Sequence, residues 1–296
     1  MPEKSVNEKH RKKQVNIRIS SGFVAIIFVL LMSCQNSRPG TIVDHGNYQL
    51  ETLHQAQGVD KRIRFLVIHY TAENFHSSLK TLTDEHVSAH YLLPAYPSSR
   101  NGKPLAFQLV PEEMRAWHAG ASYWRGRSHL NDTSIGIELV NQGLSRSMLS
   151  TEWQPYTREQ IDLLIRLSGD IVQRYALRPT DVVGHSDIAP QRKQDPGPLF
   201  PWQQLAQAGI GAWPDLLTVE HYLAGRDKQM PVPMAQLLEK LARYGYGVDP
   251  QWDLQQQRKL VAAFQMHFRP RDYRGEPDAE SEAIIDALLS KYGAAR

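Results

Sequence analysis

The 296-residue sequence predicts an α/β domain at residues 47–215, followed by a small all-α domain at residues 216–296. In the first part, short apolar runs intermix with a long segment of helical periodicity, as in folds where helices cover a sheet. In the second part, every apolar pattern has helical spacing. With 41% hydrophobic and 22% charged residues, the composition is that of a folded globular protein.

Residues 1–33 are interpreted as an export signal. Basic residues at positions 9–18 precede an apolar run at residues 22–32, which is about half the length needed to span a bilayer. Residues 31–34, Leu-Met-Ser-Cys, resemble the bacterial lipobox, which implies cleavage before Cys34 and acylation of its thiol. The alternative is a plain secretory signal or an uncleaved anchor. Gln35 is not the aspartate that usually retains lipoproteins in the inner membrane, so we expect an outer-membrane lipoprotein facing the periplasm.

The cysteine content argues against a disulfide-linked fold, and the charge argues against a protein that binds nucleic acid. Cys34 is the only cysteine, so the chain can form no internal disulfide and has no other thiol nucleophile. Removal of residues 1–33 takes away six of the 34 lysines and arginines and two of the 31 acidic residues. The mature chain then has 28 basic and 29 acidic side chains, a formal charge of −1. Because the basic character belongs to the signal, we expect no nucleic acid partner.

The elements of the mature chain follow from its apolar patterns. Residues 34–46 are polar and are expected to form a tether. Strands are expected at residues 65–68, 108–110, 134–140 and 181–184, and the first is apolar at every position, as in a strand covered on both faces. Residues 157–177 have helical spacing, and Thr157 with Gln160 suits a capping box.

Three short amphipathic helices are expected in the C-terminal domain. They cover residues 234–244, a segment that starts at residue 253, and residues 281–292. Each places leucine, isoleucine or phenylalanine on one face, and glycine- and proline-bearing turns separate them.

Two histidines stand at the ends of predicted strands. His69 follows the apolar run at residues 65–68, and His185 follows the strand that ends at Gly184. Side chains at strand ends emerge at the rim of a sheet, where α/β folds usually place functional residues. A hydrogen-bonded structural role is the alternative for each histidine alone. Two imidazoles with one carboxylate suit zinc, because three protein ligands leave the fourth tetrahedral position for water.

The residues alone leave the third ligand open between two carboxylates. Asp195 is favoured because the loop from Pro190 to Pro196 can turn the chain back toward the metal. Asp187 is the alternative, because it is only two residues from His185.

A charged residue interrupts the apolar strand at residues 134–140. An unpaired carboxylate buried at Glu138 would cost several kcal/mol, so something must compensate. A salt bridge to an arginine is one interpretation, and a general base with a raised pKa beside a metal site is the other.

Lys193 could direct a cation at a developing oxyanion or be a solvated loop residue. His90 and His118 could line a cleft, whereas the aromatic residues near His118 are expected to belong mainly to the core.

Four segments together resemble the zinc-dependent N-acetylmuramoyl-L-alanine amidases of the type 2 amidase family. They are LVIHYTA (66–72), AWHAG (116–120), NDTSIGIEL (131–139) and GHSDIAPQRKQDPGP (184–198). The resemblance implies a central mixed β-sheet flanked by helices. It also implies that His69, His185 and Asp195 bind zinc, that Glu138 is the catalytic carboxylate and that Lys193 stabilises the transition state. LARYGYGV (241–248) and AFQMHFRP (263–270) resemble a small three-helix peptidoglycan-binding domain.

The resemblance implies hydrolysis of the amide bond between N-acetylmuramic acid, or its anhydro form, and L-alanine. The expected partners are peptidoglycan, muropeptides, and the outer membrane through a lipid anchor at Cys34. Two alternatives are a module that recognises peptidoglycan without cutting it and a zinc peptidase that cuts within the stem peptide.

Overall fold

The computed structural model describes residues 41–146 and 151–295. The chain divides into two compact units, Met1–Val59 and Asp60–Arg296. In the first unit, β1 (Ile42–Asp44) and β2 (Gln49–Glu51) form an antiparallel pair that begins within the predicted tether. The predicted signal peptide and Cys34 lie outside the described residues.

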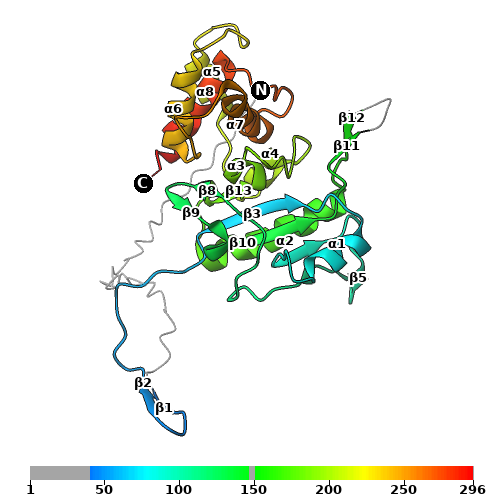
Figure 1. The fold of residues 1–296 in the computed structure, drawn as a ribbon, viewed down its shortest axis with the longest axis vertical. Coiled ribbons are helices and arrows are strands. Elements are labelled where there is room, and N and C mark those ends of the chain that lie inside the picture. Colours follow the sequence, from blue (N-terminus) through cyan, green and yellow to red (C-terminus); the bar gives the residue numbers. More distant parts are fainter. Residues whose placement is uncertain (1–40, 147–150, 296) are drawn as a thin grey trace, which may run out of the picture. The chain divides into compact units, whose positions relative to one another are not determined.

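The second unit contains a five-stranded mixed sheet (Figure 1). Its strand order is β13 (Val182–Gly184), β3 (Phe65–Tyr70), β10 (Ser134–Leu139), β4 (Tyr91–Leu93) and β7 (Phe107–Gln108). The first four strands are parallel, and β7 is antiparallel at the edge. The predicted α/β fold with a mixed sheet is therefore confirmed. The sequence patterns did not predict β4, which is only three residues long.

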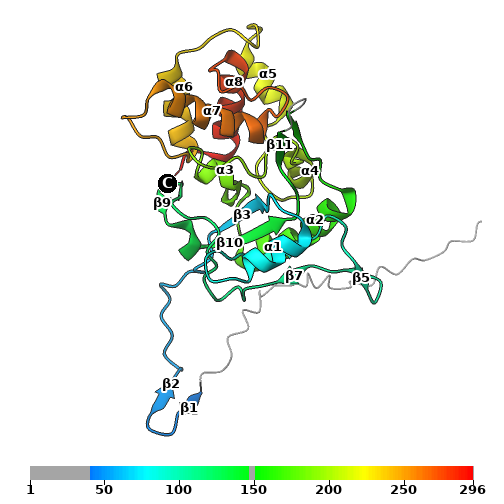
Figure 2. The ribbon, with the colours of Figure 1, turned by 45° about the vertical axis from the view of Figure 1, so that its right-hand side comes forward.

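Helices flank this sheet (Figure 2). They are α1 (Phe75–Leu82), α2 (Arg158–Tyr175), α3 (His185–Ile188) and α4 (Trp202–Gln207). Thr157 caps α2, with its hydroxyl accepting a hydrogen bond from the N–H of Gln160 at 3.1 Å. The other half of the predicted capping box is absent, because the side chain of Gln160 donates to the carbonyl oxygens of Leu93 and Val140. Successive residues of β4 belong to different apolar clusters, Leu93 with residues of α2 and Leu92 with residues of α1. The two helices therefore cover opposite faces of the sheet.

Short hairpins and turns connect these elements. The hairpin pairs are β5 (Ser99–Arg100) with β6 (Lys103–Pro104), β8 (Tyr123–Trp124) with β9 (Arg127–Ser128), and β11 (Leu144–Arg146) with β12 (Thr151–Trp153). Two single-turn 3₁₀ helices, η1 (Leu130–Asp132) and η2 (Pro179–Asp181), precede β10 and β13.

The C-terminal part is helical, as predicted. The three predicted helices are α6 (Met234–Tyr244), α7 (Leu254–Phe268) and α8 (Ala279–Tyr292), and α5 (Leu216–Leu223) packs beside α8 as a fourth. One apolar cluster joins these helices to the sheet region, with Leu241 and Phe264 beside Val67 and Trp124. Both regions belong to the same compact unit, and a domain boundary at residue 215 stays a prediction.

None of the helices in residues 41–146 and 151–295 combines the length and the hydropathy of a membrane-spanning segment.

Candidate metal centre and active site

Two neighbouring parallel strands, β3 and β10, carry predicted site residues in one row, and a third strand, β13, ends just before another. His69 of β3 is paired with Glu138 of β10. Gly184 of β13 is paired with Ile68, so His185 follows at the level of His69. Paired residues of neighbouring strands project toward the same face. The row therefore brings both histidines and Glu138 together at the carboxyl edge of the sheet.

His69, His185 and Asp195 form a buried metal-binding triad. Nδ1 of His69 lies 2.9 Å from Nδ1 of His185 and 3.1 Å from Oδ2 of Asp195, and the last two atoms are 3.0 Å apart. Ligand atoms about 2 Å from a tetrahedral ion are roughly 3.3 Å apart, so these separations fit a single zinc-sized ion. Two imidazoles and one carboxylate are also a donor set that zinc prefers.

The electrostatics of the triad support metal binding. Burial and the neighbouring His185 lower the pKa of His69 to about 4. Burial alone would raise the pKa of Asp195, but charge interactions and hydrogen bonds with His185 and His69 hold it well below its ordinary value. A neutral imidazole and an ionised carboxylate are the protonation states that metal coordination requires.

The backbone around Asp195 fixes its carboxylate beside the histidines. The N–H of Ser186, next to His185, donates to the carbonyl oxygen of Asp195 at 2.8 Å. In the intervening loop, the N–H groups of Arg192 and Lys193 both donate to the carbonyl oxygen of Ala189 at 3.1 Å, which turns the chain back. The loop thus turns the chain back toward the two histidines, which is the feature that favoured Asp195 over Asp187 as the third ligand.

Asp187 has other partners. Its Oδ1 accepts a hydrogen bond from the hydroxyl of Tyr246 at 2.7 Å. Its Oδ2 accepts from the N–H of Gly184 and lies 2.7 Å from Nδ1 of His267. Asp187 therefore links the turn after β13 to the C-terminal helices and is not a member of the triad.

Glu138 is half-buried, and one of its two carboxylate oxygens is fully buried without a partner. This atom, Oε2, has no hydrogen-bond partner among the described residues. Burial and repulsion from Asp195 raise the pKa of Glu138 to about 8, and Lys193 opposes the rise only in part. The arginine salt bridge considered from the sequence is absent among the described residues. Glu138 therefore lies beside the triad as a carboxylate that readily takes up a proton.

A cleft of about 520 Å³ opens over this row of side chains. Glu138, His185 and Asp195 line it, and half-buried Lys193 contributes a cation. Trp117 also lines the cleft and is 51% exposed, whereas Trp124 lies in the core. The five predicted site residues of the amidase region are thus brought together.

Sequence reasoning missed the full role of His118. Its Nδ1 lies 3.0 Å from Nε2 of His69, and its Nε2 lies 3.2 Å from the hydroxyl of Ser134. The amide oxygen of Asn131 accepts a hydrogen bond from the N–H of His118 at 3.0 Å. A residue that contacts the second nitrogen of a ligand histidine fixes the ring's orientation. The only signal in the sequence was the segment AWHAG, which does not show that His118 contacts the second ring nitrogen of His69.

Known proteins share the sequence and the fold of this chain. The N-acetylmuramoyl-L-alanine amidase family model matches residues 59–198. The N-acetylmuramoyl-L-alanine amidase AmiD of Escherichia coli K12 is 58% identical over 265 residues, which cover 90% of this chain and 95% of the relative. A solved complex of AmiD from E. coli has a TM-score of 0.83 and 60% identity, covering 85% of this chain and 98% of that chain. AmpDH3 of Pseudomonas aeruginosa has a TM-score of 0.74 and 46% identity, covering 84% and 98%. The chain therefore belongs to the N-acetylmuramoyl-L-alanine amidase family.

Proposed function

We propose that this chain hydrolyses the amide bond between the lactyl group of N-acetylmuramic acid, or its anhydro form, and the L-alanine of the stem peptide. The observation that carries the proposal is the convergence of three buried metal ligands beside the unpaired carboxylate of Glu138. The E. coli relative was solved with anhydro-N-acetylmuramic acid-L-Ala-D-γ-Glu-L-Lys as its substrate, which supports the same bond here.

His69, His185 and Asp195 would hold a zinc ion. Their donor set and mutual distances suit zinc, and the lowered pKa values of His69 and Asp195 leave a lone pair available on each of these two side chains. When bound, zinc polarises a carbonyl and makes water a stronger nucleophile at neutral pH.

Glu138 and Lys193 supply the remaining chemistry. The ionised form of Glu138, whose pKa is raised to about 8, accepts a proton from the attacking water, and the protonated form passes it to the departing alanine nitrogen. Lys193 lines the same cleft and stabilises the negative charge on the substrate carbonyl oxygen. Loss of one such stabiliser commonly costs about 3 kcal/mol, or roughly a hundredfold in rate.

Product identification tests this function. The purified mature protein is incubated with anhydro-muropeptides and with sacculi, before and after removal of metal by a chelator. We expect intact peptides that begin with L-alanine, loss of activity without metal, and recovery when zinc is restored. Shortened peptides would instead identify a peptidase that cuts within the stem. Binding without any cleavage by the zinc-loaded protein would identify a recognition module.

We also propose that Cys34 is acylated and that the enzyme is an outer-membrane lipoprotein facing the periplasm. The lipobox-like residues 31–34 and the absence of aspartate at position 35 support this address. Labelled palmitate should enter the wild-type protein and not the Cys34→Ala variant, and fractionation should find wild type in the outer membrane. Palmitate in both proteins, or in neither, would contradict the acylation site.

Residues 216–296 are proposed to be a peptidoglycan-binding domain that keeps the cleft near the insoluble polymer. Such attachment raises the effective substrate concentration without new contacts at the site. We expect removal of residues 216–296 to weaken co-sedimentation with sacculi, and unchanged co-sedimentation would contradict this role.

A further inference from the structure

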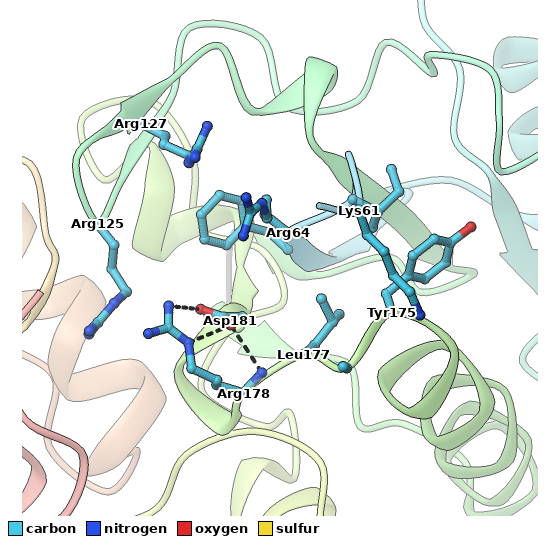
Figure 3. Close-up of a pocket in the computed structure, with 11 residues that line it drawn as sticks. Lys61, Arg64, Arg125, Arg127, Tyr175, Leu177, Arg178 and Asp181 are labelled. Atoms are coloured by element: carbon cyan, nitrogen blue, oxygen red, sulfur yellow. Dashed lines mark hydrogen bonds and ion pairs between the residues drawn. The ribbon is translucent and has the colours of Figure 1, made fainter. Parts of the chain in front are cut away.

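A second cavity, of about 570 Å³, shares no lining residue with the catalytic cleft (Figure 3). Five of its lining residues are basic: Lys61, Arg64, Arg125, Arg127 and Arg178. One carboxylate, Asp181, lines it, so the lining has a formal charge of +4. Because the mature chain as a whole has a formal charge of −1, this concentration of cations is a local feature of the fold.

The cavity lies at the edge of the sheet opposite the metal centre. Phe65, which lines the cavity, is the first residue of β3, and Asp181 immediately precedes β13. His69 and His185 lie at the other ends of these two parallel strands. Phe65 and His69 are four residues apart on β3, a rise of roughly 13 Å, so the cavity is a separate site from the metal centre.

The cationic side chains form a fixed wall and an open rim. Arg178 donates from Nε and Nη2 to Asp181 at 2.9 Å, and Arg125 donates to the carbonyl oxygen of Tyr244 at 2.6 Å. Exposed Arg127 has no side-chain hydrogen bond or ion pair within the described ranges, and in Figure 3 it points toward Arg64.

Among the described residues, the side chain of Arg64 pairs with the exposed carboxylate of Asp60. Arg127 is therefore available to an anion, and Arg64 becomes available when it exchanges this exposed partner.

We propose that this cavity binds the phosphate groups of an anionic phospholipid surface. Guanidinium groups bind phosphate through paired N–H donors, and several basic groups in one concave site favour a multiply charged surface. The inference rests on the proposed acylation of Cys34. Lys61 is the second residue of the compact unit, so the chain that leads back to the anchor leaves the unit beside this cavity.

The anchor explains why lipid is favoured over a soluble anion. Only 26 residues separate Cys34 from Lys61, so an acylated chain keeps this edge at a high effective concentration of headgroups. With the cavity on lipid, the catalytic cleft at the opposite edge faces away from the membrane, toward peptidoglycan.

The test uses the mature chain without its acyl group, residues 35–296. A solved relative aligns over 98% of its own chain with 85% of this one, which supports the use of a chain confined to this part. Binding is measured by co-sedimentation with phosphatidylglycerol vesicles and with phosphatidylcholine vesicles. We expect binding to the anionic vesicles only, weakened by salt and reduced about tenfold or more by Arg64→Glu with Arg127→Glu.

The matched control reverses two exposed arginines of α2, Arg158→Glu with Arg166→Glu. It makes the same change in net charge away from the cavity and should keep most of the vesicle binding. Both double variants should hydrolyse a soluble muropeptide at the wild-type rate, which distinguishes this inference from the proposed activity. Failure of wild type to bind anionic vesicles, or equal loss in the two double variants, would overturn it. Co-sedimentation with sacculi is measured as well. If Arg64→Glu with Arg127→Glu weakened binding to sacculi but not to anionic vesicles, the inference would also be overturned, and the cavity would be assigned to the carboxylates of stem peptides.

Discussion

At the scale of single residues, Glu138 has a carboxylate oxygen that the described residues around it leave unpaired. Its carboxylate lies in a strand whose other positions are buried, and its Oε2 has no hydrogen-bond partner among the described residues. An unpaired buried carboxylate costs several kcal/mol of folding free energy. A proton acceptor beside a metal centre needs such a setting, because burial brings the pKa of the carboxyl toward neutral pH.

Replacement of Glu138 by glutamine separates metal binding from catalysis. Glu138→Gln keeps the shape and removes the proton acceptor, so we expect full zinc content and a turnover reduced by about 10²- to 10⁴-fold. Zinc content and muropeptide hydrolysis are measured on the same sample. His185→Ala should lose both, and Glu239→Gln, at an exposed position of α6, should lose neither. Near wild-type turnover of Glu138→Gln would rule out the proposed role.

Gly136 makes room for the histidine that supports His69. A Cβ atom at this position would lie 2.5 Å from Cγ of His118, closer than atoms can pack. Gly136→Ala should therefore displace His118, lower stability by about 1–3 kcal/mol and weaken zinc retention.

Gly169 of α2 is the matched control. A Cβ atom there meets nothing within 4 Å, so Gly169→Ala should stabilise the helix by about 0.5–1 kcal/mol and leave zinc content unchanged. Urea unfolding measures the stability of the two variants, and metal analysis measures their zinc content. Equal behaviour of the two variants would show that the contact with His118 is unimportant.

At the scale of elements, the short helix α3 is held from two sides. Its first residue is the metal ligand His185, and its Asp187 accepts hydrogen bonds from Gly184 and from Tyr246, beyond the end of α6. His267 of α7 contacts the same carboxylate, and its ring stacks on Trp202 of α4 at 3.8 Å. The C-terminal helices thus contact the turn that positions a metal ligand.

Replacement of Asp187 by asparagine tests this connection. Both oxygens of the carboxylate accept hydrogen bonds, whereas an amide has one oxygen that accepts and one NH2 group that only donates. Asp187→Asn should therefore lower the free energy of unfolding by about 1–3 kcal/mol. Because His185 lies on the same helical turn, zinc should also dissociate faster. Asp215→Asn, at an exposed pair with Lys291, should change neither quantity measurably. An unchanged zinc dissociation rate in Asp187→Asn would limit Asp187 to a purely structural role.

Glu112 ties α2 to β4 and makes that link sensitive to acid. Burial alone would raise its pKa, but hydrogen bonds from Tyr91, Tyr175 and Arg174 outweigh burial and lower it below the ordinary 4.5. A carboxyl with a lowered pKa stabilises the fold above its unfolded pKa and loses that contribution as pH falls through its folded pKa.

We therefore expect Glu112→Gln to cost about 1–3 kcal/mol at pH 7 and much less at pH 3. Urea unfolding of wild type and variant at both pH values measures the difference. A cost that is the same at pH 3 and pH 7 would show that the charge of Glu112 contributes nothing.

Local patterns were sufficient for much of this fold. The unbroken apolar run of β3, the capped start of α2 and the amphipathic helices α6, α7 and α8 are visible in the sequence because each depends on neighbouring residues. The strand β4 was not predictable, because its three residues are buried by partners distant in sequence.

The same distinction holds at the site. His69 and His185 stand out because they end apolar strands, whereas the choice between Asp195 and Asp187 depends on a loop and on helices far along the chain. The contact of His118 with His69 likewise joins residues from separate segments, and no local pattern encodes it.

At the scale of the whole second unit, the sheet and the C-terminal helices share one apolar cluster. Trp124, Val183 and Ile188 from the sheet region belong to the same cluster as Leu241 and Phe264 from the helices. Apolar surface on either side is removed from water only while both sides are present, at about 25 cal/mol per Å² buried. The helices therefore stabilise the region that carries the metal ligands, in addition to any contact with peptidoglycan.

Truncation after residue 215 tests this coupling. Without the helices the shared cluster is exposed, so residues 35–215 should unfold at a lower temperature than residues 35–296, bind a hydrophobic dye and retain less zinc. Leu241→Ala, at a fully buried position, should cost about 2–5 kcal/mol in the long chain, whereas Leu254→Ala, at a position 54% exposed, should cost less than about 0.5. A truncated chain with the same melting temperature and zinc content as the long chain would mean that the amidase region needs no support from the helices. In that case, weaker co-sedimentation of the truncated chain with sacculi would come only from the lost binding of the helices to peptidoglycan.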